Sequence, residues 1–391
     1  MKPIPYGRQS INEADILHVA EVLRGDWLTQ GPNIDAFEKK VADYCGASHA
    51  VAFNSGTSAW HAAMLAAGIG PGDEVITCPL SFAATANGVL YCGATPVFAD
   101  IDPATSCLDL KAVEAKITQR TKVIAPIDYA GYPVDLPELR RIADRHGLLI
   151  IEDAAHALGA ERNGKKVGLE ADMTMFSFHP VKHITTGEGG MIVTNSDEMA
   201  DRLRLFRSHG ITRVPELLQE NHGPWYYEMQ ELGFNFRITD IQCALGSSQL
   251  SRLDEFVSAR NRIARRYDKA FRDCPGIGTP MAPAGGKHAY HLYPIQVSSP
   301  EPGARQAGFE AENAYRRRFF EYLRENGILV QVHYIPIHLH PYYRKHYGYQ
   351  WGDFPLSEQF YAREISLPMF PELTEAQLEY VIEKVLSFKF G

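Results

Sequence analysis

The feature that most constrains the fold of this chain is a series of short apolar runs separated by stretches of helix length. Each run is too short for a helix, and most are rich in β-branched side chains and end near Gly, Pro or Asp. They show little alternation of apolar and polar residues, so both faces of the resulting strands should be buried. Such strands, joined by helices, form a largely parallel sheet covered on both sides. The runs are HAVAF (49–53), EVIT (74–77), KVIAPI (122–127), LLII (148–151), MTMFSF (173–178) and GMIVT (190–194).

Helices and a second, smaller unit are predicted around this sheet. Before the first run, Ile16, Val19, Ala20 and Leu23 recur at helical spacing. A long helix is predicted from about Thr239 to Phe271, and the Pro- and Gly-rich stretch 275–287 after it is typical of a linker.

The C-terminal part has the pattern of an α+β unit. It predicts a strand (290–297), a helix (309–326), a second strand (328–334) and a last helix from about Thr374 to Phe388. We therefore expect two domains, a large one over residues 1–274 that includes the N-terminal segment and the long helix, and a small one over residues 275–391.

Composition excludes several classes of protein. The net charge of −8 argues against a nucleic-acid surface, and no apolar run reaches the roughly 18 residues that a membrane span needs. The N-terminus, MKPIPYGRQS, lacks the apolar region of a signal peptide. The six cysteines form no CxxC and lie mostly in apolar runs, so we expect buried thiols in a reducing cytoplasm, with neither disulfides nor a metal site.

Parallel sheets bind ligands at the carboxyl ends of their strands, so the polar residues after each run are candidates for a site. HAVAF is followed by Asn54-Ser55-Gly56-Thr57-Ser58 and then by a helix. A glycine and two hydroxyls at a helix N-terminus suit a phosphate group, although an ordinary N-cap has the same composition.

Two further segments add an acid and an amine. After LLII comes Glu152-Asp153, and an acid at the tip of a buried strand is costly unless it meets a cation or hydrogen-bond donors; a capping role is the alternative. After MTMFSF, a Gly-rich loop contains Lys182, five residues after Ser177. This lysine is a candidate Schiff-base amine, or else an exposed loop lysine. Together, the phosphate-binding helix start, the acid and the lysine match what pyridoxal phosphate requires.

Rival nucleotide and metal motifs fail on their context. The stretch GAERNGKK fits G-x-x-x-x-G-K, but Lys166 follows where Ser or Thr should bind Mg²⁺, and Asn163-Gly164 is typical of a hairpin turn. His338 and His340 lack further metal ligands nearby, and the run 316–318 of three arginines is typical of a solvated helix face.

The motifs NSGTSA, SFAATANGV, EDAAH, SFHPVKHITTGEGG and GFNFRITDIQCALG occur in this order, and over essentially the whole chain they resemble the DegT/DnrJ/EryC1/StrS sugar-nucleotide aminotransferase family. The resemblance implies the type I pyridoxal-phosphate aminotransferase fold, an α/β fold with a mostly parallel mixed sheet sandwiched by helices and a smaller C-terminal α+β domain. It also implies pyridoxal 5′-phosphate as cofactor, L-glutamate as amino donor and a homodimer with shared active sites. Relatives that dehydrate sugars carry His in place of the lysine, whereas Lys182 is present here.

The resemblance implies a role for each matching residue. Lys182 is the Schiff-base amine and Asp153 the partner of the pyridinium nitrogen, with His156 near the phenolic oxygen and Phe82 stacked on the ring. The phosphate-binding residues are Gly56, Thr57, Ser58, Ser177 and, from the partner subunit, Asn235.

Within the family, LTQGP, FHPVKHITTGEGG and VQVHYIPIHLHPYY most resemble the members of pseudaminic acid synthesis. They aminate UDP-2-acetamido-2,6-dideoxy-β-L-arabino-hex-4-ulose to UDP-4-amino-4,6-dideoxy-N-acetyl-β-L-altrosamine. The alternatives are another 4-keto sugar nucleotide, of the bacillosamine, perosamine or aminoarabinose type, and a non-catalytic sensor of the same fold. The substrate-binding positions carried over are Tyr6, Asp26, Trp27, Leu28, Thr29, Ser55, Ser177, Asn235, Gln331, Val332, His333 and Tyr334.

Overall fold

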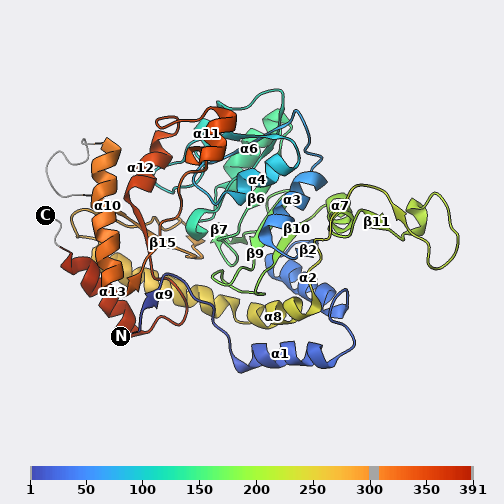
Figure 1. The fold of residues 1–391 in the computed structure, drawn as a ribbon, viewed down its shortest axis with the longest axis horizontal. Helices are drawn as coiled ribbons and strands as arrows, with labels where there is room; N and C mark the ends of the chain where they lie inside the picture. The colour runs from blue at the N-terminus through green and yellow to red at the C-terminus, as the bar shows by residue number, and fades with distance from the viewer. Residues whose placement is uncertain (1, 299–307, 389–391) are drawn as a thin grey trace.

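A seven-stranded mixed sheet forms the centre of the molecule in the computed structural model, which describes residues 2–298 and 308–388 (Figure 1). Only β10 runs antiparallel to its neighbours β2 and β9; the remaining pairs are parallel. The predicted mostly parallel sheet is therefore confirmed. In spatial order the strands are β2 (His49–Phe53), β10 (Gly190–Thr194), β9 (Met173–Ser177), β6 (Leu149–Asp153), β5 (Thr121–Ile124), β3 (Glu74–Thr77) and β4 (Thr95–Phe98).

Each of the six apolar runs forms one of these strands, and the sequence missed the seventh. This is β4, at the edge of the sheet next to β3, and it contains Pro96. Proline lacks the N–H that a central strand needs, so it weakens the strand signal, but an edge strand tolerates it.

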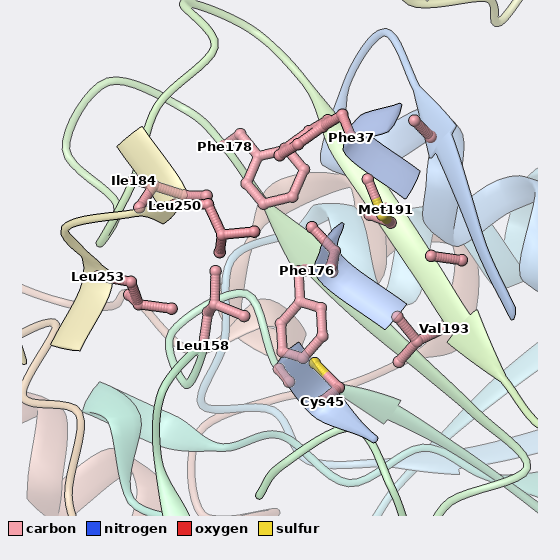
Figure 2. Packing of buried hydrophobic residues seen from close by; sticks show 14 of the residues in the cluster. Phe37, Cys45, Leu158, Phe176, Phe178, Ile184, Met191, Val193, Leu250 and Leu253 are labelled. Carbon is pink, nitrogen blue, oxygen red and sulfur yellow. The ribbon is translucent and has the colours of Figure 1, made fainter. Parts of the chain in front are cut away.

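Side chains alternate between two buried faces of the sheet. On β2, Val51 and Phe53 pack with Trp60 of α3 (Gly56–Ala66) and with α7 (Asp197–Arg207), whereas Ala50 and Ala52 face α2 (Pro32–Cys45) and α8 (Asp240–Leu250). Figure 2 shows this second face, where Phe37 of α2 and Phe176 and Phe178 in and after β9 pack near two leucines. These are Leu250 of α8 and Leu253, the first residue of the next helix. Burying each large apolar side chain contributes roughly 1.5–3 kcal/mol, so both layers hold the sheet rigidly.

The predicted long helix at 239–271 is wrong in one respect, because it is two helices, α8 and α9 (Leu253–Phe271). The backbone leaves the helical region at Arg252, whose guanidinium pairs at 2.5 Å with the buried Asp15 of α1 (Glu13–Arg24). Ser248 and Gln249 donate hydrogen bonds to the same carboxylate. The periodicity of apolar residues does not reveal this break, which lies where polar side chains contact α1, a helix far away in sequence.

The C-terminal unit has its own sheet and hydrophobic cluster. Strand β15 (Tyr293–Val297) lies between β13 (Ile277–Gly278) and β17 (Glu364–Leu367), all antiparallel, under α10 (Gly308–Glu325) and α13 (Glu375–Ser387). Its cluster also takes Ile4, Tyr267 and Phe271 from earlier in the chain. The boundary at residue 275 stays a prediction.

Two of the predicted C-terminal strands are shorter than expected. The first begins at Tyr293 rather than at residue 290, and the second, β16, covers only Ile328–Leu329 and pairs in parallel with β1 (Ile4–Pro5). The rest of the 328–334 segment is irregular and reaches the site described below. The last helix agrees with the prediction, with Thr374 as its N-cap.

All six cysteines are free; Cys45, Cys78, Cys107 and Cys243 are buried, as predicted, whereas Cys92 and Cys274 are partly exposed. Asn163 and Gly164 form the predicted hairpin turn, with φ of 51° and 77°. Among the residues that the structure describes, no helix has the length and apolar character to cross a membrane. Further α-helices and strands are α4 (Ala84–Tyr91), α5 (Leu110–Glu114), α6 (Leu136–His146), β7 (Glu161–Arg162), β8 (Lys165–Lys166), β14 (Gly286–Lys287), α11 (Pro341–Tyr347) and α12 (Pro355–Arg363). Short 3₁₀ helices lie at Tyr129–Gly131, Pro215–Leu217 and Ile337–Leu339.

Two exposed apolar surfaces stand out. Ile16 and Leu23 of α1 are 52% and 58% exposed, although their helical spacing predicts a buried face. The segment that contains β11 (Ile211–Thr212) and β12 (Glu228–Met229) extends away from the body (Figure 1), and we call residues 211–232 the arm. Trp225 and Leu232 of the arm are 71% and 77% exposed.

Candidate active site

A pocket of about 470 Å³ lies at the carboxyl ends of β6 and β9, beside the N-terminus of α3. The position matches the edge at which parallel sheets bind ligands. The sequence-predicted residues that line it are Tyr6, Ser55, Gly56, Thr57, Phe82, Asp153, His156, Ser177, Lys182, His333 and Tyr334.

Lys182 lies in the connection between β9 and the antiparallel β10. The two strands pair at Ser177 and Gly190, and Phe178 N–H donates to the Gly189 carbonyl at 2.9 Å, so both ends of the loop are fixed. The Lys182 amine lies 3.4 Å from Nε2 of His291. Burial lowers the pKa of Lys182 to about 7; the Asp153 carboxylate opposes this shift. A large fraction of the amine is therefore uncharged at neutral pH.

Asp153 ends β6 and is only 6% exposed. Its Oδ2 accepts a hydrogen bond of 2.6 Å from the Thr85 hydroxyl on α4, and its Oδ1 accepts one of 3.2 Å from the Ala155 N–H. Burial raises the pKa of Asp153, and these two donors and the Lys182 amine offset part of that rise. These hydrogen bonds offset part of the free-energy cost of burying an acid at the end of a strand.

Two histidines and two aromatic rings form further parts of the pocket wall, near Lys182 and Asp153. His156 Nε2 lies 3.1 Å from the Tyr334 hydroxyl, and burial holds the pKa of His156 well below its usual value, so the ring is neutral. His333 is bonded through Nδ1 to the Ser366 hydroxyl at 2.8 Å. Phe82 is 62% exposed at the rim, with its ring centroid 6.1 Å from that of Tyr334.

The N-terminus of α3 forms the end of the pocket that suits a phosphate. Ser55 caps the helix, and its hydroxyl accepts from the Ser58 N–H at 3.0 Å. A Cβ on Gly56 would lie 3.2 Å from the Ser177 hydroxyl, so the absence of a side chain keeps the first turn of the helix close to that hydroxyl. Backbone N–H groups and the positive end of the helix dipole favour an anion there.

Several predicted residues lie outside the pocket. The Ser58 hydroxyl instead donates to Asn54 Oδ1 at 2.6 Å within the cap. Asn235 is exposed and forms an isolated β-bridge with Ser208. The others outside the pocket are Asp26, Trp27, Leu28, Thr29, Gln331 and Val332.

The sequence reasoning missed Thr85, Ser81 and His291, which all line the pocket. Thr85 lies inside the motif SFAATANGV, but it is too far from Asp153 in sequence for the contact to be predicted. His291 precedes a strand of the C-terminal unit, and only its residue type could have drawn attention to it.

Comparisons with known proteins agree with this geometry. Residues 9–386 match the model of the DegT/DnrJ/EryC1/StrS aminotransferase family. The chain is 41% identical to the spore coat polysaccharide biosynthesis protein SpsC of Bacillus subtilis, over 99% of this chain and 97% of that protein. It is 40% identical to GDP-perosamine synthase of Caulobacter vibrioides, over 95% and 94%. It is 36% identical to UDP-4-amino-4,6-dideoxy-N-acetyl-beta-L-altrosamine transaminase of Campylobacter jejuni, over 98% and 97%.

Among solved structures, Helicobacter pylori PseC, an aminotransferase involved in the biosynthesis of pseudoaminic acid, matches with a TM-score of 0.89 and 36% identity, over 98% of both chains. The fold is thus that of the type I pyridoxal-phosphate aminotransferases. The chain belongs to the DegT/DnrJ/EryC1/StrS aminotransferase family, and it is a sugar-nucleotide aminotransferase that uses pyridoxal 5′-phosphate.

Proposed function

We propose that the pocket binds pyridoxal 5′-phosphate with Lys182 as the Schiff-base amine and transfers an amino group from L-glutamate to C4 of UDP-2-acetamido-2,6-dideoxy-β-L-arabino-hex-4-ulose. The observation that supports this most is the convergence of three groups on one pocket: the Lys182 amine, the buried Asp153 carboxylate and the N-terminus of α3. The amine can react with the aldehyde of the cofactor, the carboxylate can pair with its ring nitrogen, and the helix N-terminus can bind its phosphate. When bound, the cofactor supplies an electron sink for the carbanion that proton removal creates.

Each residue then has a distinct task. The Asp153 carboxylate, whose pKa the Thr85 and Ala155 donors lower against the effect of burial, would hold the proton at the ring nitrogen. Lys182, with a pKa of about 7, can accept a proton from the substrate carbon at neutral pH and return it. Gly56, Thr57 and Ser177 would hold the phosphate, and Phe82 and His156 would contact the ring.

The substrate part of the proposal is supported by the similarity to the altrosamine transaminase and to PseC, and by the positions of Tyr6, Ser55, His333 and Tyr334 in the pocket wall. The similarity to GDP-perosamine synthase supports an alternative, the same reaction on another 4-keto sugar nucleotide.

A substrate panel tests the proposal and its alternative. Purified protein with L-glutamate is offered 4-keto sugars linked to UDP, GDP or dTDP, and 2-oxoglutarate and the aminated sugar are measured. We expect the highest kcat/KM with the UDP-linked N-acetylhexosamine, and loss of turnover in Lys182→Ala. Preference for the GDP-linked sugar would establish the alternative, and turnover by Lys182→Ala at the wild-type rate would contradict the assignment of the lysine.

We also propose that the working unit is a homodimer in which Asn235 reaches the phosphate of the partner's cofactor. Asn235 lies outside the pocket of its own chain, close to the exposed arm. The apolar side chains of the arm and of α1 lack a covering layer among the described residues, and a second copy would bury them. The free thiols suit a reducing cytoplasm, which we propose as the location.

Complementation tests the shared site. Lys182→Ala and Asn235→Ala homodimers should each be impaired, the former severely. After co-refolding in equal amounts, half of the dimers are mixed, and one site of each mixed dimer has both residues intact. Activity should recover to roughly a quarter of wild type, because random pairing restores one site in four. A mixture with only the average activity of the two variants would refute the shared site.

A further inference from the structure

His291 is the side chain that contacts the free Lys182 amine, and the proposed mechanism gives it no role. The residue is 5% exposed, and its Nε2 lies 3.4 Å from Lys182 Nζ. Nothing in the sequence marks it, because it precedes β15 in the C-terminal unit, far from the motifs of the large sheet.

The backbone of His291 is firmly fixed. The guanidinium of the fully buried Arg260 donates to the carbonyls of Tyr290, His291 and Met369 at 3.1, 3.2 and 2.8 Å. All three bonds leave from Nη1, so this one nitrogen of α9 ties the turn before β15 to the carbonyl of Met369.

The ring itself is confined by two other histidines. The centroid of His156 lies 4.3 Å away at 36° between the planes, and that of His183 lies 5.8 Å away. Burial holds the pKa of His291 well below its usual value, and the groups that face it, Lys182, His156, His183 and Arg260, lower it further. His291 is therefore a neutral imidazole with a single N–H.

The position of that hydrogen follows from the surroundings of the two ring nitrogens. Nδ1 is buried and has no hydrogen-bond partner among the residues that the structure describes. A hydrogen on Nδ1 would be a buried donor without an acceptor, and such orphaned N–H groups are rarer than under-used acceptors. A hydrogen on Nε2 instead points at the Lys182 amine, which has a lone pair only when it is uncharged.

We propose that His291 donates its Nε2 hydrogen to the lone pair of the free Lys182 amine and thereby holds this amine neutral and oriented for proton transfer. The inference rests on the proposed function of Lys182 and adds a residue to it. In the step that Lys182 performs, the C–H bond of the substrate breaks, its electron pair stays with the carbon and the cofactor system, and the proton forms a new bond with Nζ. The ammonium has no lone pair left for His291, so the lost hydrogen bond favours passing the proton on.

The test measures the protonation of Lys182 directly, in the apoenzyme. Only an uncharged amine reacts with 1-fluoro-2,4-dinitrobenzene, so the labelling rate of Lys182 against pH, followed by mass spectrometry of its peptide, gives the midpoint of its titration. A neutral hydrogen bond contributes about 0.5–1.5 kcal/mol, and one pKa unit corresponds to about 1.4 kcal/mol. We therefore expect His291→Phe to raise the midpoint by up to about one pH unit.

Two further variants separate this effect from general damage. His291→Gln keeps a side-chain N–H donor of similar reach and should restore most of the wild-type midpoint. His288→Asn changes a buried histidine that stacks on Tyr290 rather than contacting Lys182, and it should leave the midpoint unchanged. In the loaded enzyme, His291→Phe should lower kcat at pH 7 up to about tenfold, leave KM for glutamate nearly unchanged and move the pH profile to higher pH.

An unchanged midpoint in folded His291→Phe, or a lower one, would overturn the proposal; a lower one would mean that His291 accepts a hydrogen bond from the ammonium. If wild type failed to turn over any 4-keto sugar while the labelling midpoint still moved as expected, the proposed function would fail and the His291–Lys182 contact would stand. If both held, the two proposals would support each other.

Discussion

Thr85→Val removes the hydroxyl that donates to the buried Asp153 carboxylate and leaves almost everything else in place. Thr85 is 2% exposed, and its hydroxyl lies 2.6 Å from Asp153 Oδ2 and 3.0 Å from the Ser81 hydroxyl. Valine has the same shape, so the substitution replaces a donor by a methyl group without creating a cavity. The backbone carbonyl of residue 85 still accepts from Trp60, since that bond does not involve the side chain.

The magnitude follows from the charge of the acceptor. A hydrogen bond to an ionised group contributes about 1.5–3 kcal/mol, against about 1 kcal/mol for a neutral pair. Burial already raises the pKa of Asp153, and the Thr85 bond opposes this rise. Its loss should raise the pKa of Asp153 further, because the ionised form loses about 0.5–2 kcal/mol more than the protonated form.

The sign of the pH dependence can be worked out from that direction. A carboxyl whose pKa is higher in the folded protein than in the unfolded chain stabilises the fold fully below the unfolded value and progressively less as pH rises through the folded value. Thr85→Val moves the folded value up, so its destabilisation should be about 1 kcal/mol at acid pH and about 1.5–3 kcal/mol once wild-type Asp153 is ionised.

Urea unfolding of the apoenzyme at pH 5 and pH 8 measures this difference, with Thr85→Ser as the control that keeps the hydroxyl. The acid limb of kcat against pH should also move to higher pH in Thr85→Val. Equal stability of Thr85→Val and wild type at pH 8, or a larger deficit at pH 5 than at pH 8, would refute the reasoning.

Three other substitutions have equally definite outcomes. Lys182→Met should stabilise the apoenzyme, because the wild-type amine has a pKa of about 7 when folded and about 10.5 when unfolded. The increase in the free energy of unfolding, at most roughly 5 kcal/mol, should be greatest at or below pH 7 and vanish towards pH 10.5. Thermal unfolding at several pH values measures it. Asp153→Asn should fold and still bind cofactor but lose most of kcat. An unchanged kcat would mean that Asp153 only caps the end of its strand. Gly190→Ala should weaken cofactor binding in a titration, since its Cβ would lie 2.5 Å from the Ser55 carbonyl and push the N-terminus of α3 aside; affinity equal to wild type would contradict this account.

The sequence was sufficient for the parts of the fold that local patterns determine. All six apolar runs are strands, because a run buried on both faces must be apolar along its whole length. The break at Arg252 and the edge strand at Pro96 were missed, since the first depends on a distant carboxylate and the second on its place in the sheet.

The same division holds for the site. Asp153 ends one strand of the sheet and Lys182 follows the neighbouring strand, so their meeting could be predicted from topology alone. Thr85 and His291 could not, because a helix and the C-terminal unit bring them to the pocket by tertiary packing. The positions of Asn235 and of residues 26–29 outside the pocket are what a site completed by a second chain would produce, which keeps their roles predictions.

The pairing of β1 with β16 has a consequence for the order of events during synthesis. Ile4 lies opposite Ile328 and belongs to the cluster of the C-terminal unit, and Tyr6 lines the pocket together with Tyr334. At about 5–20 residues per second, a ribosome needs roughly 15 to 65 seconds between making the two ends of this contact. The N-terminal segment must wait exposed for that time, while the large sheet can already form beside it. The pocket is thus closed only after Tyr334 has been made, so a chain truncated before residue 328 would carry the lysine and the aspartate yet lack a finished wall around them.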